Sequence, residues 1–157
     1  MKFKIDNNDG DKYKIYEYGD GLSMIINKVA DPNNGGNGVA IYPTAGANVS
    51  VHYTGYLEDG TIFDSSAGRA AFKFKLKEGR VIKGWDESFS RVPWMIGEER
   101  TVIIPSSLGY GTRGAGSKIP PASILIFDMF LEGIEGDGTS QVTEELLKSR
   151  GFINVSN

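Results

Sequence analysis

The segment LGYGTRGAGSKIPPASILIF, residues 108–127, has glycine spacings that in other proteins bind phosphate. The G-x-G-x-x-G pattern of dinucleotide sites begins at Gly109, and the glycine spacing of a Walker loop begins at Gly111. Both sites need a helix after the loop, because the N–H groups of the helix N-terminus hold the phosphate. Here Pro120 and Pro121 follow, and then a β-branched run, so the segment cannot open that helix. We therefore exclude a phosphate site.

Side chains for nucleophilic or metal chemistry are scarce. The chain has no cysteine, which excludes thiolate catalysis, disulfides and cysteine-ligated zinc. Its one histidine, His52, lies inside the strand-like VSVHYTG, where a Ser-His-Asp triad would need a cleft. We interpret His52 as a strand residue held by its neighbours. The acidic DNNDGD at 6–11 lacks the later glutamate of a calcium loop, so we expect a solvated turn there and neither metal nor cofactor.

Aromatic side chains are the remaining candidates for a functional site. Six of them occur on different segments: Tyr53, Phe63, Phe72, Trp85, Tyr110 and Phe127. A plain hydrophobic core would account for this distribution, and so would a pocket. A pocket is favoured by Asp64, which directly follows Phe63, and by Tyr110, which lies in a glycine-rich loop where a core tyrosine would be exposed. Aromatic walls with a few fixed polar groups suit an apolar ligand such as proline.

Elements of a β-rich domain must position these side chains. Glycine makes up 21 of the 157 residues, against a usual share of about 7%, which indicates many turns. Alternating apolar residues predict a weak hairpin within residues 1–20 and clearer strands at 22–30, 72–76, 99–107 and 122–134. Residues 48–66 predict two further strands joined at Asp59-Gly60, a pair that favours a hairpin turn.

Two short helices are expected among these strands. Apolar residues at three- and four-residue steps predict an amphipathic helix that ends at Pro93 and Gly97 and carries Val81, Ile82, Trp85 and Phe89. A second helix over 143–151, with acidic residues in its first turn and a glycine stop, is expected on the surface. The fold class is therefore α+β, with a curved antiparallel sheet of five or six strands around one central short helix.

Several motifs, in this order, resemble the FKBP-type peptidyl-prolyl cis–trans isomerases. They are VHYTGYLEDGTIFDSS, VIKGWDESF and LGYGTRGAGSKIPPASILIFDMFLEGI, and the similarity runs from about Pro43 to Ile134. The resemblance implies a half-barrel sheet wrapped around one short helix, which agrees with the elements above. It predicts an isomerase domain over 41–135, an N-terminal extension with short strands over 1–40, and a C-terminal tail with a short helix over 136–157.

The resemblance also implies which residues form a proline pocket. The catalytic set would be Asp64, Tyr110, Phe63, Trp85 and Phe127, with Trp85 as the floor and Asp64 and Tyr110 at the polar rim. The substrate-binding set would be Tyr53, Phe72, Val81, Ile82, Ile119 and Arg69. The Ile82 N–H would donate to a ligand carbonyl, and Arg69 lies at the spacing of the arginine that pairs with the pocket aspartate. Ala115 and Lys118 depart from residues common in the family's flap.

The resemblance implies an isomerase that acts on X-Pro bonds in peptides and unfolded chains, with tacrolimus- or rapamycin-type macrolides as inhibitors. The alternative is a non-catalytic proline-binding or chaperone module that uses the same pocket. A net charge of −3 offers no basic field for nucleic acid or anionic membrane. With no apolar leader or membrane-length apolar run, we expect a cytoplasmic protein, or an exported one if the chain is a fragment that lacks its signal. With no heptad pattern, we expect a monomer.

Overall fold

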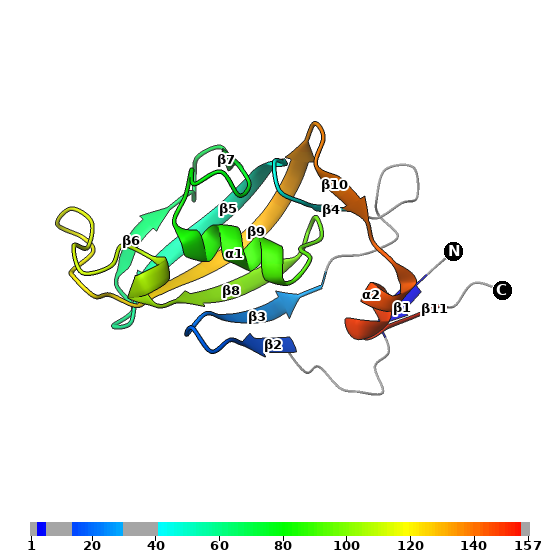
Figure 1. Cartoon of the computed structure of the whole chain (residues 1–157), viewed down its shortest axis with the longest axis horizontal. Helices are drawn as coiled ribbons and strands as arrows, with labels where there is room; N and C mark the ends of the chain where they lie inside the picture. Colours follow the sequence, from blue (N-terminus) through cyan, green and yellow to red (C-terminus); the bar gives the residue numbers. More distant parts are fainter. Residues whose placement is uncertain (1–2, 6–13, 30–40, 155–157) are drawn as a thin grey trace.

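The computed structural model describes residues 3–5, 14–29 and 41–154. Its main body is one seven-stranded antiparallel sheet in the order β2-β3-β8-β9-β5-β6, with β7 also pairing with β5. These strands are β2 (Lys14–Glu17), β3 (Ser23–Lys28), β5 (Asn48–Leu57), β6 (Ile62–Ser65), β7 (Phe72–Lys75), β8 (Glu99–Ile104) and β9 (Leu125–Glu135). The sheet curves around helix α1 (Lys83–Arg91), which lies across its concave face (Figure 1). The predicted fold class is confirmed.

Apolar and polar residues alternate along the strands, so that one face of the sheet is buried. Val49 and Val51 of β5 and Val102 and Ile104 of β8 are fully buried and belong to the core cluster that packs against α1. A Cβ atom on Gly84 would lie 2.6 Å from the side chain of Ile104, so this glycine lets the helix approach the sheet closely. The predicted hairpin at Asp59-Gly60 joins β5 to β6, and Gly60 adopts a φ of 89°.

Helix α1 begins later than its apolar periodicity predicts. Ile82 is the N-cap residue, with an extended ψ of 149°, and the helix itself starts at Lys83. Val81 and Ile82 extend the apolar pattern because they pack against the same core from the segment before the helix. The predicted stop is confirmed: Val92 is extended at φ −135°, as the residue before Pro93 tends to be.

The hairpin predicted within residues 1–20 is wrong. Strand β1 (Phe3–Ile5) instead pairs with β11 (Phe152–Asn154) at the other end of the chain, and β2 pairs with β3. The turn that forms lies between β2 and β3, where the Tyr18 N–H bonds to the Leu22 carbonyl at 3.0 Å and Gly21 has a φ of 95°. The expected solvated turn at 6–11 lies outside the described residues.

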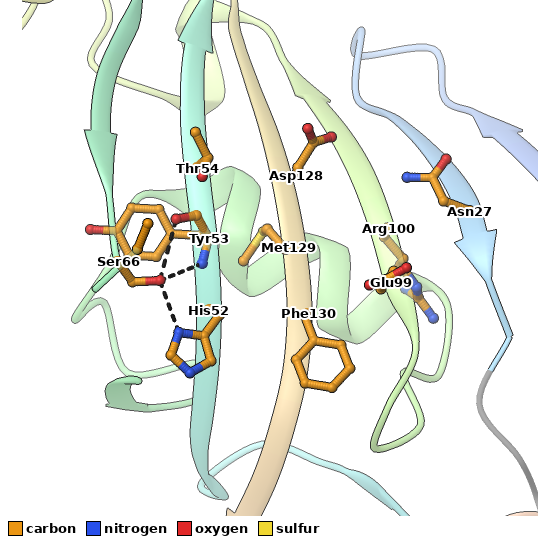
Figure 2. Close-up of a pocket in the computed structure, with 11 residues that line it drawn as sticks. Asn27, His52, Tyr53, Thr54, Ser66, Glu99, Arg100, Asp128, Met129 and Phe130 are labelled. Carbon is orange, nitrogen blue, oxygen red and sulfur yellow. Dashed lines mark hydrogen bonds between the residues drawn. The ribbon is translucent and has the colours of Figure 1, made fainter. Parts of the chain in front are cut away.

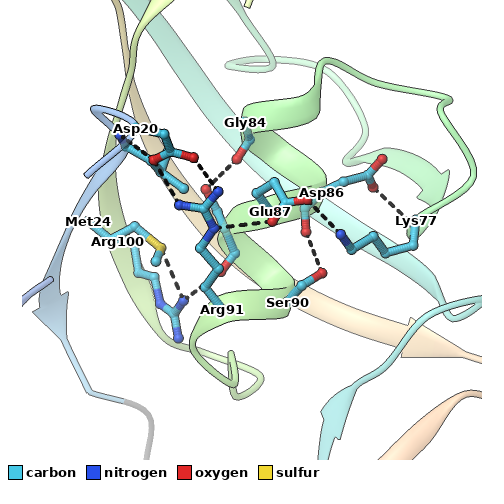
Figure 3. Close-up of polar contacts among 11 residues, drawn as sticks. Asp20, Met24, Lys77, Gly84, Asp86, Glu87, Ser90, Arg91 and Arg100 are labelled. Carbon is cyan, nitrogen blue, oxygen red and sulfur yellow. Dashed lines mark hydrogen bonds and ion pairs between the residues drawn. The ribbon is translucent and has the colours of Figure 1, made fainter. Parts of the chain in front are cut away.

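Ionic contacts join this β2–β3 turn to α1. The guanidinium of Arg91 donates to both carboxylate oxygens of Asp20, at 3.0 and 2.5 Å, and its Nε donates to Glu87 at 3.1 Å (Figure 3). Glu87 also accepts a 2.7 Å bond from Lys77, in the connection that precedes the helix. The helix is therefore tied on both sides to segments that lie outside it.

A second charged group lies fully inside the protein. Arg100 of β8 is completely buried and donates to Glu98 at 2.7 Å and to the Val92 carbonyl at 2.9 Å. Its guanidinium lies 4.3 Å from the centroid of the Trp94 ring, and it also donates to the Pro93 carbonyl. These bonds hold the irregular segment between α1 and β8 against the sheet.

The C-terminal segment packs onto that same irregular segment. Helix α2 (Glu144–Ser149) begins where predicted, with the Thr143 hydroxyl accepting from the Leu146 N–H at 3.1 Å. Leu147 is buried against Met95, and Arg150, also buried, donates to the Pro93 carbonyl at 2.6 Å. Ahead of the helix, β10 (Thr139–Gln141) pairs with β4 (Ile41–Pro43). No helix within the described residues is long and apolar enough to cross a membrane.

Candidate functional site

Aromatic side chains from several elements meet around Trp85. Its ring lies 5.0 Å from Tyr53 of β5, 5.3 Å from Phe127 of β9 and 5.9 Å from Phe72 of β7, measured between ring centroids. All three pairs are edge-to-face, the geometry that aromatic quadrupoles favour. Trp85 is only 4% exposed, so α1 places it beneath the other rings. The sequence-predicted aromatic residues are thus brought together.

Gly55 makes this packing possible, and sequence reasoning missed it. It lies on β5 opposite Phe127 of β9 and Asp64 of β6. A Cβ atom at this position would lie 2.5 Å from the Phe63 ring and 2.9 Å from the Phe127 ring, whose centroids are 5.4 Å apart. A lone glycine inside a strand pattern is a general signal of close approach and could have indicated it. Phe74, 5.6 Å from Trp85, was predicted only as a sheet residue.

The polar rim is a short hydrogen-bonded chain. The Tyr53 hydroxyl donates to Asp64 Oδ2 at 2.6 Å, while Asp64 Oδ1 accepts from the Ser65 N–H at 2.9 Å and from Arg69 at 3.3 Å. The Asp64–Arg69 pairing that the resemblance implies is therefore present. Burial, and then the bond to the Asp64 carboxylate, raise the pKa of Tyr53 to about 12. Tyr53 consequently remains a neutral donor at neutral pH and fixes the orientation of Asp64.

The glycine-rich segment forms a flap beside this rim. It follows the short 3₁₀ turn Ser106–Leu108, and Ala115 and Ile119 form an antiparallel bridge with bonds of 2.9 and 3.1 Å. Gly114, at φ 67°, has to be glycine because a Cβ atom would overlap the Ile119 carbonyl. A cavity of about 340 Å³ opens between the flap and β6, lined by Phe63, Asp64, Tyr110, Ala115, Gly116, Ser117, Lys118 and Ile119.

The remaining predicted residues border these two regions. Val81 and Ile82 are half-buried against the hydrophobic core that contains Trp85 and Phe127, and Phe72 is 41% exposed beside Trp85. Tyr110 is 42% exposed on the flap, whereas Ile119 is buried there. Phe63 joins the two regions, because it lines the cavity and its ring contacts Phe127. Every residue of the two predicted sets therefore lies in one continuous region, and the roles assigned to them remain predictions.

A larger hollow of about 430 Å³ lies on the outer face of the sheet and contains His52 (Figure 2). His52 contacts Ser66 Oγ at 3.1 Å and Glu132 at 3.3 Å, an apparent Ser-His-Glu array. Ser66 is only 3% exposed, however, and its hydroxyl accepts a 2.9 Å bond from the Tyr53 N–H. A buried serine engaged with the backbone is unsuited to attack a substrate. His52 is therefore a strand residue held by its neighbours, as predicted.

The fold and the site together define a class of protein: a β half-barrel whose concave face holds a cluster of aromatic rings beside a short helix. Within the described residues, no three His, Cys, Asp or Glu side chains are grouped to hold a metal. The groups that the site presents are aromatic rings, the Asp64 carboxylate and tyrosine hydroxyls, which are suited to binding and orienting a ligand.

Comparison with known proteins identifies that class. A family model described as FKBP-type peptidyl-prolyl cis-trans isomerase matches residues 40–132. FK506-binding protein 2 of Yarrowia lipolytica is 52% identical over 94 residues, covering 59% of this chain and 64% of the relative. FK506-binding protein 1 of Dictyostelium discoideum is 48% identical over 90 residues, covering 57% of this chain and 82% of the relative.

A solved structure agrees with these sequence matches. The crystal structure of AtFKBP13 superposes with a TM-score of 0.66 at 35% identity, covering 78% of this chain and 99% of that chain. The chain belongs to the FKBP-type peptidyl-prolyl cis–trans isomerase family. The match spans slightly less than two thirds of the Yarrowia relative's length.

Proposed function

We propose that this chain catalyses the cis–trans isomerisation of X-Pro bonds in peptides and unfolded proteins. Family membership supports this activity. The observation that carries the proposal is the position of Trp85 beneath the rings of Tyr53, Phe72 and Phe127. Phe63 links this cluster to the cavity beside Asp64, because its ring contacts Phe127 and also lines the cavity. The proline ring would lie on this aromatic floor, and the amide would face the polar rim.

The reaction needs no nucleophile, metal or proton transfer. Rotation about an X-Pro amide has a barrier of about 18–20 kcal/mol, because the planar resonance is lost in the twisted state. An enzyme accelerates the rotation by binding the twisted amide more tightly than either planar isomer. An apolar pocket favours the twisted amide, because that form is less dipolar than the planar ones. The aromatic floor supplies such a pocket.

The polar rim would orient the bound amide. Asp64 is held in one orientation by Tyr53 and Arg69, so its carboxylate presents a fixed negative charge to the cavity. The exposed Tyr110 lines the same cavity and can donate from its hydroxyl to a ligand carbonyl. One hydrogen bond contributes about 1 kcal/mol, so these groups tune the rate of rotation. The aromatic pocket would provide most of the rate acceleration.

We propose that the same pocket binds macrolides of the tacrolimus (FK506) type, since the similar proteins of Yarrowia and Dictyostelium are FK506-binding proteins. Isomerisation of a proline peptide, followed by NMR exchange with and without tacrolimus, tests both parts of the proposal. We expect acceleration by the wild-type protein and its loss when the macrolide is added. Peptide or macrolide binding without any acceleration would overturn the catalytic proposal and favour the non-catalytic binding module.

A further inference from the structure

Two segments of the site carry cations and no acidic residues: the flap, which lines the cavity, and the stretch that leads into α1. The flap, residues 109–121, contains Arg113 and Lys118, and the stretch RVIKGW, residues 80–85, contains Arg80 and Lys83. All four side chains are exposed. This concentration contrasts with the whole chain, whose net charge is −3.

These four cations, which we call the mouth cations, differ from neighbouring lysines in lacking carboxylate partners. Nearby, Lys73 pairs with Glu135 at 2.8 Å, and Lys75 pairs with Glu78 at 3.6 Å. In the part of the chain that the structure describes, no mouth cation has a carboxylate oxygen within 4.0 Å. Their charges are therefore available to a ligand.

The acidic groups closest to these segments are already occupied. Asp64, which lines the cavity together with Lys118, accepts bonds from Tyr53 and Arg69. Beside the other segment, Asp86 accepts the Lys77 N–H at 2.8 Å, and Glu87 pairs with Lys77 at 2.7 Å. The rim is thus cationic once its internal pairs are counted.

We propose that the mouth cations, Lys118 above all, select substrates with an acidic residue next to the proline. This inference rests on the proposed isomerase function, and it names the substrate class of the same pocket. Lys118 lies between the cavity and solvent, so an acidic side chain flanking a bound proline would approach its ammonium group. Exposed ion pairs contribute modestly to the free energy of binding, and salt weakens them. We therefore expect kcat/KM to be about two- to five-fold higher for an acidic peptide than for its neutral counterpart.

Matched peptides measure this preference directly. The peptides Ala-Ala-Xaa-Pro-Phe and Ala-Ala-Pro-Xaa-Phe, with Xaa as Glu, Gln or Lys, are compared by NMR exchange at low salt. We expect kcat/KM to fall in the order Glu, Gln, Lys in at least one series, with about two- to five-fold between Glu and Gln. The difference should nearly vanish in about 1 M salt, where the Debye length is about 3 Å.

Variants assign the preference to the flap. The double variant Arg113→Gln, Lys118→Gln should lower the Glu-to-Gln ratio toward one. The matched control is Lys148→Gln, which removes an exposed cation on α2 that pairs with Glu144 and should leave the ratio unchanged. Equal rates for Glu and Gln peptides in both series would overturn the inference, as would a preference that survives in the double variant.

A failure of the proposed function is distinguishable from a failure of this inference. If no peptide is isomerised, the catalytic proposal is wrong. The Kd values of the same peptides, measured by calorimetry, then decide the preference, and equal values for Glu and Gln would overturn it. If all peptides are isomerised at equal rates, only the inference about acidic substrates is wrong.

Discussion

Tyr53 and Asp64 are joined across the pocket rim by a 2.6 Å hydrogen bond that links β5 to β6. Because Arg69 approaches the other oxygen of the same carboxylate, Asp64 is held from two sides and still lines the cavity. The pair explains how a half-exposed acid can keep one orientation toward a ligand. Both oxygens of this carboxylate accept hydrogen bonds within the protein, which suits the orienting role proposed for Asp64.

Replacing Asp64 by alanine should reduce turnover and not abolish it. The substitution removes one oriented group worth about 1 kcal/mol, so kcat/KM for a proline peptide should fall about five-fold. Tyr110→Phe should have an effect of similar size, for the same reason. NMR exchange checks the rate, and circular dichroism checks folding. Complete loss of turnover in folded Asp64→Ala would contradict catalysis by binding and orientation alone.

Tyr53 should ionise at a higher pH than an ordinary tyrosine does. Burial and the Asp64 carboxylate raise its pKa to about 12, whereas an ordinary tyrosine has a pKa of 10.0. The neutral phenol is therefore favoured by folding below pH 10, and this contribution is lost as pH rises through 12. Absorbance near the phenolate band should show a late transition that disappears in Tyr53→Phe. Asp64→Asn should move this transition to lower pH.

The aromatic floor should be needed for both stability and activity. Trp85 is nearly buried, so Trp85→Ala should cost about 3–5 kcal/mol in the free energy of unfolding and remove the surface on which proline lies. Phe127→Ala, also buried, should behave similarly. Phe72→Ala is the matched control, since its 41% exposed ring should cost less stability while still reducing activity. Urea unfolding should separate these effects, and equal losses of stability for Trp85→Ala and Phe72→Ala would contradict this assignment.

Removing one partner of the Glu98–Arg100 ion pair should lower the free energy of unfolding far more than replacing both partners with uncharged residues. Both side chains are fully buried, and burial holds the pKa of Arg100 below its usual range while Glu98 opposes that shift. Arg100→Met leaves a buried carboxylate without its partner, which should cost about 3–5 kcal/mol. The double variant Glu98→Gln, Arg100→Met should recover part of that loss in urea unfolding. If the double variant is no more stable than the single one, the cost lies in the carbonyl contacts of Arg100 and not in the ion pair.

Local sequence patterns predicted most of the sheet, and the resemblance named residues that the structure brings together around Trp85 and the flap. Strands such as β7 and the β5–β6 hairpin follow from alternation and from a turn pair that tolerates positive φ. The pairing of β1 with β11 could not be predicted, because weak alternation identifies a strand and not its partner. The bond between Arg150 and Pro93 likewise depends on a tertiary approach that no short-range pattern encodes.

The same distinction applies within the site. The resemblance supplied the identities of the pocket residues, whereas the contribution of Gly55 depends on how closely two rings approach its backbone. The late start of α1 has a similar origin, since Val81 and Ile82 are apolar for reasons of packing and not of helical periodicity. At Val81 and Ile82 the periodicity indicated packing against the core correctly and left the backbone conformation undetermined.

Asp20 should make the stability of the domain sensitive to acid. Hydrogen bonding from Arg91, assisted by the Leu22 N–H, lowers its pKa from 3.8 to about 2. A depressed pKa in the folded state means that the contribution is present above pH 4 and is lost as pH falls from 4 through 2. Asp20→Asn should therefore lower Tm at pH 7, and the difference from wild type should disappear near pH 2. Asp137→Asn, a change at an exposed loop acid, is the control and should leave Tm nearly unchanged at both pH values. A Tm difference for Asp20→Asn that stays constant between pH 7 and pH 2 would mean that the Asp20–Arg91 contact does not hold the β2–β3 turn to α1.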